Sequence, residues 1–210
     1  MAFCLRLEET HPPHKRMTGS LLSIFTVLGK ILTNRTFMGF AGIQALIMGV
    51  LFAYIASSSF IFQTAYGVGK FTYGLCFGLN GAALVAGAAL ARKMRVQRAL
   101  RYGIGGFAAA AVLVTLFLIA HAPLWLLETG LFLLLFCMGG VNPGLSALAM
   151  STERQYAGSA SAFLGFFGFT LGGAVSPLVG IGNIFYATAT AITVCALLAA
   201  TLYWQMRDKA

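Results

Sequence analysis

The sequence predicts an all-α membrane protein with six transmembrane helices. Hydrophobic residues make up 59% of its 210 residues and charged residues only 9%, whereas soluble domains have about 45–50% and about 25%. A soluble fold of this length leaves too much of its surface wet to hide so much apolar area. Six apolar segments are also long enough to cross a bilayer, which takes about 20 residues.

The six segments cover approximately residues 37–62, 71–91, 102–120, 124–150, 158–180 and 184–205. None alternates with the period of two that membrane β-strands show, so we expect helices rather than a barrel. Between Met17 and Arg35, apolar residues recur at helical spacing among polar ones, which predicts an amphipathic helix on the membrane surface. We therefore divide the chain into a loop segment over residues 1–35 and a six-helix bundle over residues 36–210.

The basic residues predict how these segments are oriented. Of the 14 lysines and arginines, Lys70 alone falls on one side of the predicted membrane and all others fall on the opposite side. Short loops rich in lysine and arginine stay in the cytoplasm, so we expect both termini there and the protein in the cell inner (plasma) membrane. The same placement indicates that the net charge of +9 belongs to membrane loops and not to a nucleic-acid interface.

The remaining composition argues against an enzyme. Cys4, Cys76, Cys137 and Cys195 are scattered without a Cys-x-x-Cys pair, so neither a disulfide framework nor a zinc site is expected. No metal-ligand cluster and no nucleophile–base pair is visible in the sequence. We therefore expect no catalytic activity, no metal and no cofactor.

Polar residues inside the apolar segments mark a candidate binding wall. Gln44, Leu51 and Tyr54 lie along one stripe of the first helix, and such a mixture suits an amphipathic ligand. Asn142 precedes Pro143, and a proline that frees a carbonyl is tolerated at membrane depth only inside protein or beside a cavity. The other expected wall residues, for each of which plain packing is the alternative, are Asn80, Met138, Phe166 and Phe167.

Glu128 is the single charged residue well inside any predicted span. A carboxylate is costly in hydrocarbon, so an acid there is a candidate for carrying protons. It follows Pro123 by five residues, which places it only about 7–8 Å into its helix. The alternative is therefore an acid near the interface, stabilised by the positive end of the helix dipole.

Three motifs carry a resemblance to a known family: Leu7-Glu8-Glu9-Thr10-His11-Pro12-Pro13, Leu51-Phe52-Ala53-Tyr54-Ile55-Ala56 and Ala157-Gly158-Ser159-Ala160-Ser161-Ala162. With them the chain resembles the major facilitator superfamily, and within it the Bcr/CflA-type drug-resistance exporters. Such transporters have two six-helix halves with the ligand site between them. The resemblance implies that this chain is the C-terminal half, helices seven to twelve.

Two stretches depart from the pattern of that family. Ser58-Ser59 stands where the family more often has Ser-Pro, so the proline that would bend this helix is missing. Residues 87–95 are a degenerate form of the superfamily motif Gly-x-x-x-Asp-Arg-x-Gly-Arg, with Ala91 in place of the acid and Met94 in place of the glycine. In the family, the intact motif and the acid thought to carry protons belong to the other half.

The leading hypothesis is a drug/proton antiporter of small amphipathic, drug-like compounds, present as its C-terminal half. Its expected partners are the lipid bilayer, the substrate, a proton and an N-terminal six-helix half, against which this bundle would rock in alternating access. The alternative is a degenerate six-helix membrane protein that transports nothing and binds another membrane protein.

Overall fold

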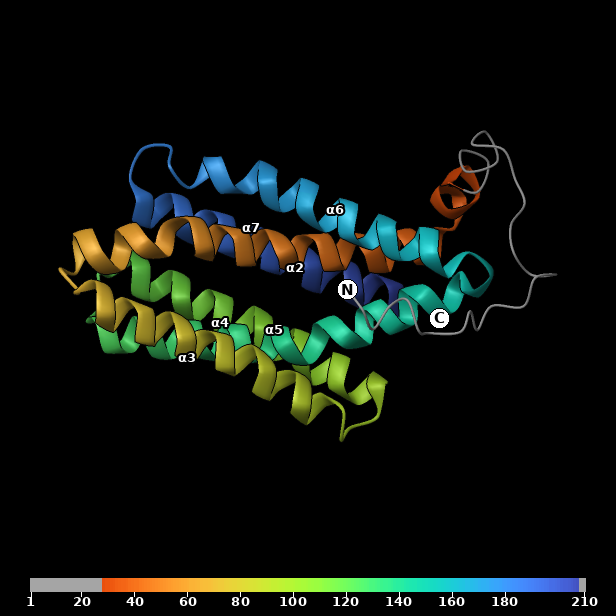
Figure 1. Ribbon diagram of the computed structural model, residues 1–210, viewed down its shortest axis with the longest axis horizontal. Helices are drawn as coiled ribbons and strands as arrows, with labels where there is room; N and C mark the ends of the chain where they lie inside the picture. The colour runs from red at the N-terminus through yellow and green to blue at the C-terminus, as the bar shows by residue number, and fades with distance from the viewer. Residues whose placement is uncertain (1–27, 208–210) are drawn as a thin grey trace, which may run out of the picture.

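The structure is a computed structural model and describes residues 28–207 (Figure 1). Six long helices run side by side in this part of the chain, and each is long and apolar enough to cross a membrane. The predicted all-α membrane fold is therefore confirmed. The helices are α2 (Arg35–Ser59), α3 (Lys70–Ala91), α4 (Val96–Ile119), α5 (Leu124–Thr152), α6 (Ala157–Leu178) and α7 (Ile184–Arg207), with a π-helix, η2 (Phe60–Ala65), extending α2 and a short 3₁₀ turn, η3 (Arg154–Tyr156), before α6.

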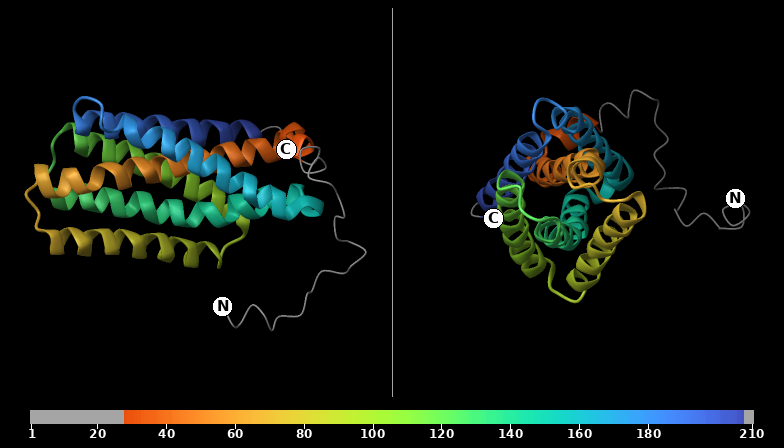
Figure 2. Two further views of the ribbon diagram at one scale, coloured as in Figure 1. Left: turned by 45° about the horizontal axis from the view of Figure 1, so that its top comes forward. Right: turned by 90° about the vertical axis from the view of Figure 1, so that its left-hand side faces the viewer.

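The centre of the bundle is formed by α2, α4, α5 and α7. Helix α3 packs mainly against α5 and helix α6 mainly against α2, so both lie at the periphery (Figure 2). Successive helices run in opposite directions, which gathers Arg35, residues 92–101, Arg154 and Arg207 at one end of the bundle (Figure 1). We call this the basic end; Lys70 lies at the opposite end.

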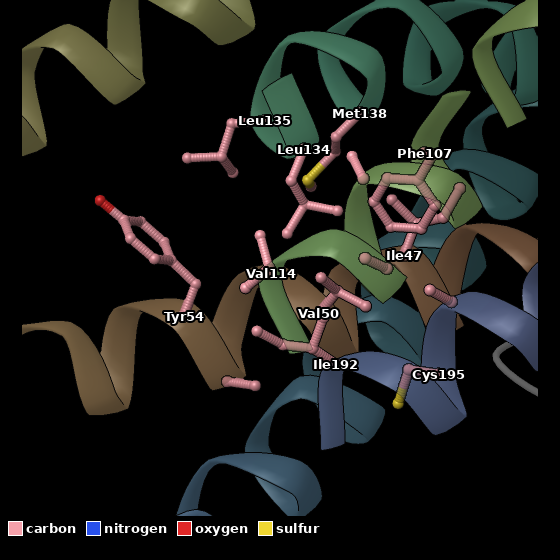
Figure 3. Close-up of a cluster of buried hydrophobic side chains, with 14 of the residues drawn as sticks. Ile47, Val50, Tyr54, Phe107, Val114, Leu134, Leu135, Met138, Ile192 and Cys195 are labelled. Atoms are coloured by element: carbon pink, nitrogen blue, oxygen red, sulfur yellow. The ribbon is translucent and has the colours of Figure 1, made fainter. Parts of the chain in front are cut away.

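The hydrophobic core lies between the central helices (Figure 3). Ile47 and Val50 of α2 meet Phe107 of α4, Leu134 of α5 and Ile192 of α7, and all of them are fully buried. Since lipid is as apolar as these side chains, close packing and not exclusion from solvent holds such helices together. The core is therefore a fixed scaffold for the polar residues at its edge.

Helix α4 begins six residues earlier than its apolar segment predicted, at Val96 instead of residue 102. Its first two turns contain Arg98 and Arg101, and a search for apolar segments leaves such charged residues out. They are nevertheless helical, because their long side chains can extend the charges to the membrane surface. Helix α5 runs on past Pro143 to Thr152, whereas α6 ends at Leu178, directly after Pro177.

The predicted amphipathic helix falls mostly outside the described residues, and only its last turns, residues 28–33, are seen as helix. Ile31 is fully buried there against α2, α5 and α6, in a small cluster with Phe37, Ala149 and Leu164. Asn34 then ends this turn, and its Oδ1 accepts hydrogen bonds from the first backbone N–H groups of α2. The segment that enters the bundle is thus packed against it.

Two glycines allow α3 to lie directly on α5. A Cβ atom at Gly87 of α3 would overlap the carbonyl oxygen of Phe136, and one at Gly139 of α5 would overlap that of Leu84. Backbone atoms cannot move aside as a flexible side chain can. The contact between these two helices therefore requires glycine at both positions, as is typical of membrane helices that approach closely.

Replacing Gly87 or Gly139 with alanine is expected to destabilise the bundle by about 1–3 kcal/mol, because overpacking forces α3 away from α5. Gly81→Ala in α3 is the matched control: its methyl group would have no atom within 4 Å. Unfolding of the purified chain by SDS in mixed micelles, followed by circular dichroism, measures the difference. Equal stability of Gly87→Ala and Gly81→Ala would contradict the packing described here.

Candidate functional site

A phenol, an amide and a carboxyl group meet inside the bundle. Nδ2 of Asn80 on α3 donates to Oη of Tyr54 on α2 at 3.2 Å and to Oε2 of Glu128 on α5, also at 3.2 Å. Tyr54 is 4% exposed and Asn80 1%, so two of the three groups are shielded from solvent. This arrangement, which we call the amide cluster, links three helices through one side chain.

Each member of the amide cluster is positioned by its own helix. Tyr54 lies at the edge of the hydrophobic core with its ring directed away from Val50 and Ile192 (Figure 3). The ring stacks on Phe77 of α3, with centroids 5.9 Å apart and planes inclined by 12°. Asn80 stands one turn beyond Phe77 and is the buried polar residue of α3. Packing against Phe77 thus positions the ring of Tyr54 in addition to the hydrogen bond from Asn80.

Glu128 reaches deeper than its place in α5 suggests. Its backbone lies about one turn inside the helix, yet its carboxyl group contacts Asn80, which stands halfway along α3. Burying a carboxyl group at such depth costs free energy unless polar partners accompany it. The structure therefore places the acid in a polar cluster that joins α2, α3 and α5.

A second polar contact joins α2 and α5 nearer the basic end. Oγ of Ser146 donates to Oε1 of Gln44 at 3.1 Å. Asn142 lies one turn before Ser146 on α5, so both side chains share a face of that helix. Gln44 of α2 therefore contacts the same face of α5 that carries Asn142, the other predicted wall residue.

Unused hydrogen-bonding capacity is concentrated at the predicted residues. Within residues 28–207, four buried side-chain polar atoms have no partner: Oδ1 of Asn80, Oε1 of Glu128, Oδ1 of Asn142 and Oγ1 of Thr188. Three of the four belong to residues singled out from the sequence. A buried polar atom without a partner is unfavourable and needs a reason, such as a ligand that satisfies it.

The structure separates the other predicted wall residues from these contacts. Met138 is 1% exposed in the main core, and Leu51 packs against that core. Phe166 is 62% exposed on α6, where its ring lies against Phe167. None of these four residues contacts the amide cluster through a hydrogen bond in this structure, and their role as wall residues stays a prediction. Within residues 28–207, no three His, Cys, Asp or Glu side chains lie close enough together to hold a metal ion.

The sequence did not single out Ser146, Tyr73 or Phe77. Tyr73 and Ser58 share a hydrogen bond of 3.0 Å between α3 and α2. The one usable signal is the spacing of four residues from Asn142 to Ser146, which puts two polar groups on one helical face. Tyr73 and Phe77 have the same spacing, but aromatic residues in a membrane helix do not distinguish lipid contact from helix contact.

Six apolar helices, with a phenol–amide–carboxyl cluster between three of them, define a multi-pass membrane protein. A family model described as Major Facilitator Superfamily matches residues 1–177. The chain therefore belongs to the major facilitator superfamily, as the motifs predicted.

Characterised and uncharacterised transporters are among its relatives. The chain is 36% identical over 188 residues to an uncharacterized MFS-type transporter, YdgK, of Bacillus subtilis, covering 87% of this chain and 46% of that protein. It is 32% identical over 183 residues to the multidrug transporter MdfA of Edwardsiella piscicida, covering 80% of this chain and 44% of that protein. The chain thus spans less than half the length of these relatives.

The amide cluster can be tested as a unit by a double-mutant cycle. Asn80→Ala and Glu128→Ala should each destabilise the chain, and the double variant should cost less than the sum, because neither group is then left unpaired. We expect a coupling free energy of about 1 kcal/mol, the usual size for hydrogen bonds between membrane helices. Unfolding by SDS gives the four stabilities. The effects of the control pair, Asn80→Ala and Gln44→Ala, should be additive. Additive effects in both cycles would contradict an interaction between Asn80 and Glu128.

Proposed function

We propose that this chain forms the C-terminal six-helix half of a drug/proton antiporter that exports small amphipathic compounds. The observation that carries the proposal is the amide cluster with its unused acceptor atoms, Oδ1 of Asn80 and Oε1 of Glu128. A ligand with a donor group would satisfy these atoms, while Phe77 and the ring of Tyr54 offer an apolar surface beside them. Such a mixture of aromatic and polar groups suits compounds that are neither fully polar nor fully apolar.

The open faces of α3 and α6 support a partner half. Both peripheral helices expose large apolar side chains: Phe71, Leu75, Leu79 and Val85 on α3, and Phe166, Phe169 and Leu178 on α6. Gly74 and Gly78 of α3, and Gly165 and Gly173 of α6, have no atom near the position of a Cβ. Small residues between larger ones let another helix approach, so the second half would pack along these helices. The wall of Gln44, Tyr54 and Asn142 would then open alternately to each side of the membrane.

Glu128 is the candidate proton carrier of this half. It shares the Nδ2 donor of Asn80 with Tyr54. A ligand that bonds to the Tyr54 hydroxyl would alter the donation from Asn80 to the carboxylate, so ligand and proton would each affect the binding of the other. Such reciprocal coupling is what an antiporter requires.

The non-transporting membrane partner remains the second candidate. The degenerate motif at residues 87–95, without its acid and second glycine, favours it. Under this reading the same open faces of α3 and α6 would bind another membrane protein, and the amide cluster would be a structural contact.

Orientation can be measured with single cysteines in a background where the four native cysteines are replaced by serine. We expect Lys70→Cys to react with an impermeant thiol reagent added to intact cells, and Arg92→Cys and Arg154→Cys to react only after lysis. All three positions are exposed, so accessibility to solvent does not separate them. The unequal distribution of basic residues is the physical reason, and labelling of Arg92→Cys from outside would reverse the assigned orientation.

The function is tested by expressing the chain in a drug-sensitive bacterium, alone and together with the part of a full-length relative that the chain does not match. We expect resistance to chloramphenicol, and efflux of ethidium, only on co-expression. Tyr54→Phe and Asn142→Ala should change the ratio of the two activities, and Glu128→Gln should lower both, because it removes a group proposed to couple ligand and proton binding. Thr201→Ala, in the last turns of α7, is the control.

The outcomes separate the candidates once membrane abundance is measured by immunoblotting. Resistance from the chain alone, lost in Glu128→Gln, would reject the half-transporter and indicate a self-sufficient homodimer. No resistance in either arm at normal abundance would favour the non-transporting partner. If Tyr54→Phe and Asn142→Ala lower the membrane abundance and the activity to the same extent, both residues have a structural role only.

A further inference from the structure

A cavity of about 680 Å³ opens at the basic end of the bundle. Its wall is built from the ends of α2, α4, α5 and α7, with no residue from α3 or α6. Near the opposite end, α4 and α7 are held together by a hydrogen bond between Thr115 and Thr193, and the two helices separate toward the basic end (Figures 1 and 2). The cavity is therefore distinct from the amide cluster and from the faces proposed to meet a second half.

Three arginines line the mouth of this cavity: Arg35 of α2, and Arg98 and Arg101 of α4. Gln97 adds a further polar group. The acids among residues 28–207 are Glu128 and Glu153, and neither lines the cavity. Glu153 instead accepts a hydrogen bond of 2.6 Å from Asn34. Within the described chain, the lining of the cavity thus includes three positive charges and no anion.

The helix dipoles increase this imbalance. Arg35 and Arg98 lie in the first turns of α2 and α4, where the dipole is positive and a basic residue is unfavourable. Neither helix has an acidic residue in its first turn, and the N-cap of α4 is Arg95, which makes no side-chain capping bond. A bound anion would offset both the charges and the dipoles, as anions do at helix N-termini.

The floor of the cavity is apolar. Phe40 lies five residues inside α2 and Leu148 four residues from the end of α5, so both are about 6–8 Å deeper than the helix ends. Helix ends with arginines mark the headgroup level of a bilayer, and residues one to two turns deeper lie at the level of the acyl chains. Helical side chains point back toward the N-terminus, so the arginines of α4 extend toward the helix ends, and the cavity is basic there and apolar beneath.

We propose that this cavity binds the phosphate headgroup of an anionic phospholipid, such as phosphatidylglycerol, with the start of an acyl chain on Phe40 and Leu148. Basic pockets between transmembrane helices on the side of positive loops are suited to such lipids. The arginines donate paired hydrogen bonds to phosphate oxygens. A lipid at this place would bridge α4 and α7, because Arg98 of α4 and Tyr203 and Met206 of α7 all line the cavity.

The test uses the full chain in a neutral detergent, titrated with phosphatidylglycerol or phosphatidylcholine of identical acyl chains, or with inorganic phosphate. We expect phosphatidylglycerol alone to raise the unfolding temperature and to remain bound in native mass spectrometry. In Arg98→Gln/Arg101→Gln its apparent affinity should fall about 30-fold, which corresponds to about 1 kcal/mol for each of two charges near the headgroup.

The matched control is Arg92→Gln/Lys93→Gln, which removes the same charge from a loop outside the cavity and should leave the affinity unchanged. Arg98→Lys/Arg101→Lys keeps the charge without the paired hydrogen bonds. It should bind the lipid more weakly than the unchanged chain and more tightly than the folded glutamine variant. Equal effects of the two glutamine variants, or equal stabilisation by both lipids, would overturn the proposal. Stabilisation by inorganic phosphate as strong as by phosphatidylglycerol would assign the site to a soluble anion instead.

Discussion

The hydrocarbon core of a bilayer offers no hydrogen-bond partners, and most features of this chain follow from that constraint. The backbone must bond to itself, which restricts the spanning segments to helices. Each polar side chain between them needs a partner, either on its own helix, as Ser57 has, or on a neighbouring helix, as Asn80 and Gln44 have. Where an acceptor stays free, as on Glu128, the chain carries a cost that a structural role alone does not explain.

The same constraint explains how the helices are held together. Apolar side chains gain little from leaving lipid, so association depends on close fit. Gly87 and Gly139 supply that fit between α3 and α5, and the amide cluster forms across the same pair of helices. Close backbone packing and the polar contact are therefore coupled: a larger residue at either glycine would also lengthen the hydrogen bond from Asn80 to Glu128.

The spans were predictable from sequence because crossing a bilayer is a property of length and composition along one dimension. The start of α4 was not, because Arg98 and Arg101 are helical without being apolar. For the site, Tyr54, Asn80 and Glu128 stood out individually as polar residues in apolar runs. That they meet depends on how α2, α3 and α5 are rotated, and a helix surrounded by lipid has no polar face to reveal its rotation.

Asn34 makes two kinds of contact at once. Its Oδ1 caps α2, while its Nδ2 donates to Glu153, between α5 and the turn that leads into α6. The chain that enters the bundle is thereby tied to two helices that are distant from it in sequence. A pull transmitted along that entering chain acts on the junction of α5 and α6 as well as on α2. Displacement of the preceding segment would therefore strain the contact with Glu153 as well as the cap of α2.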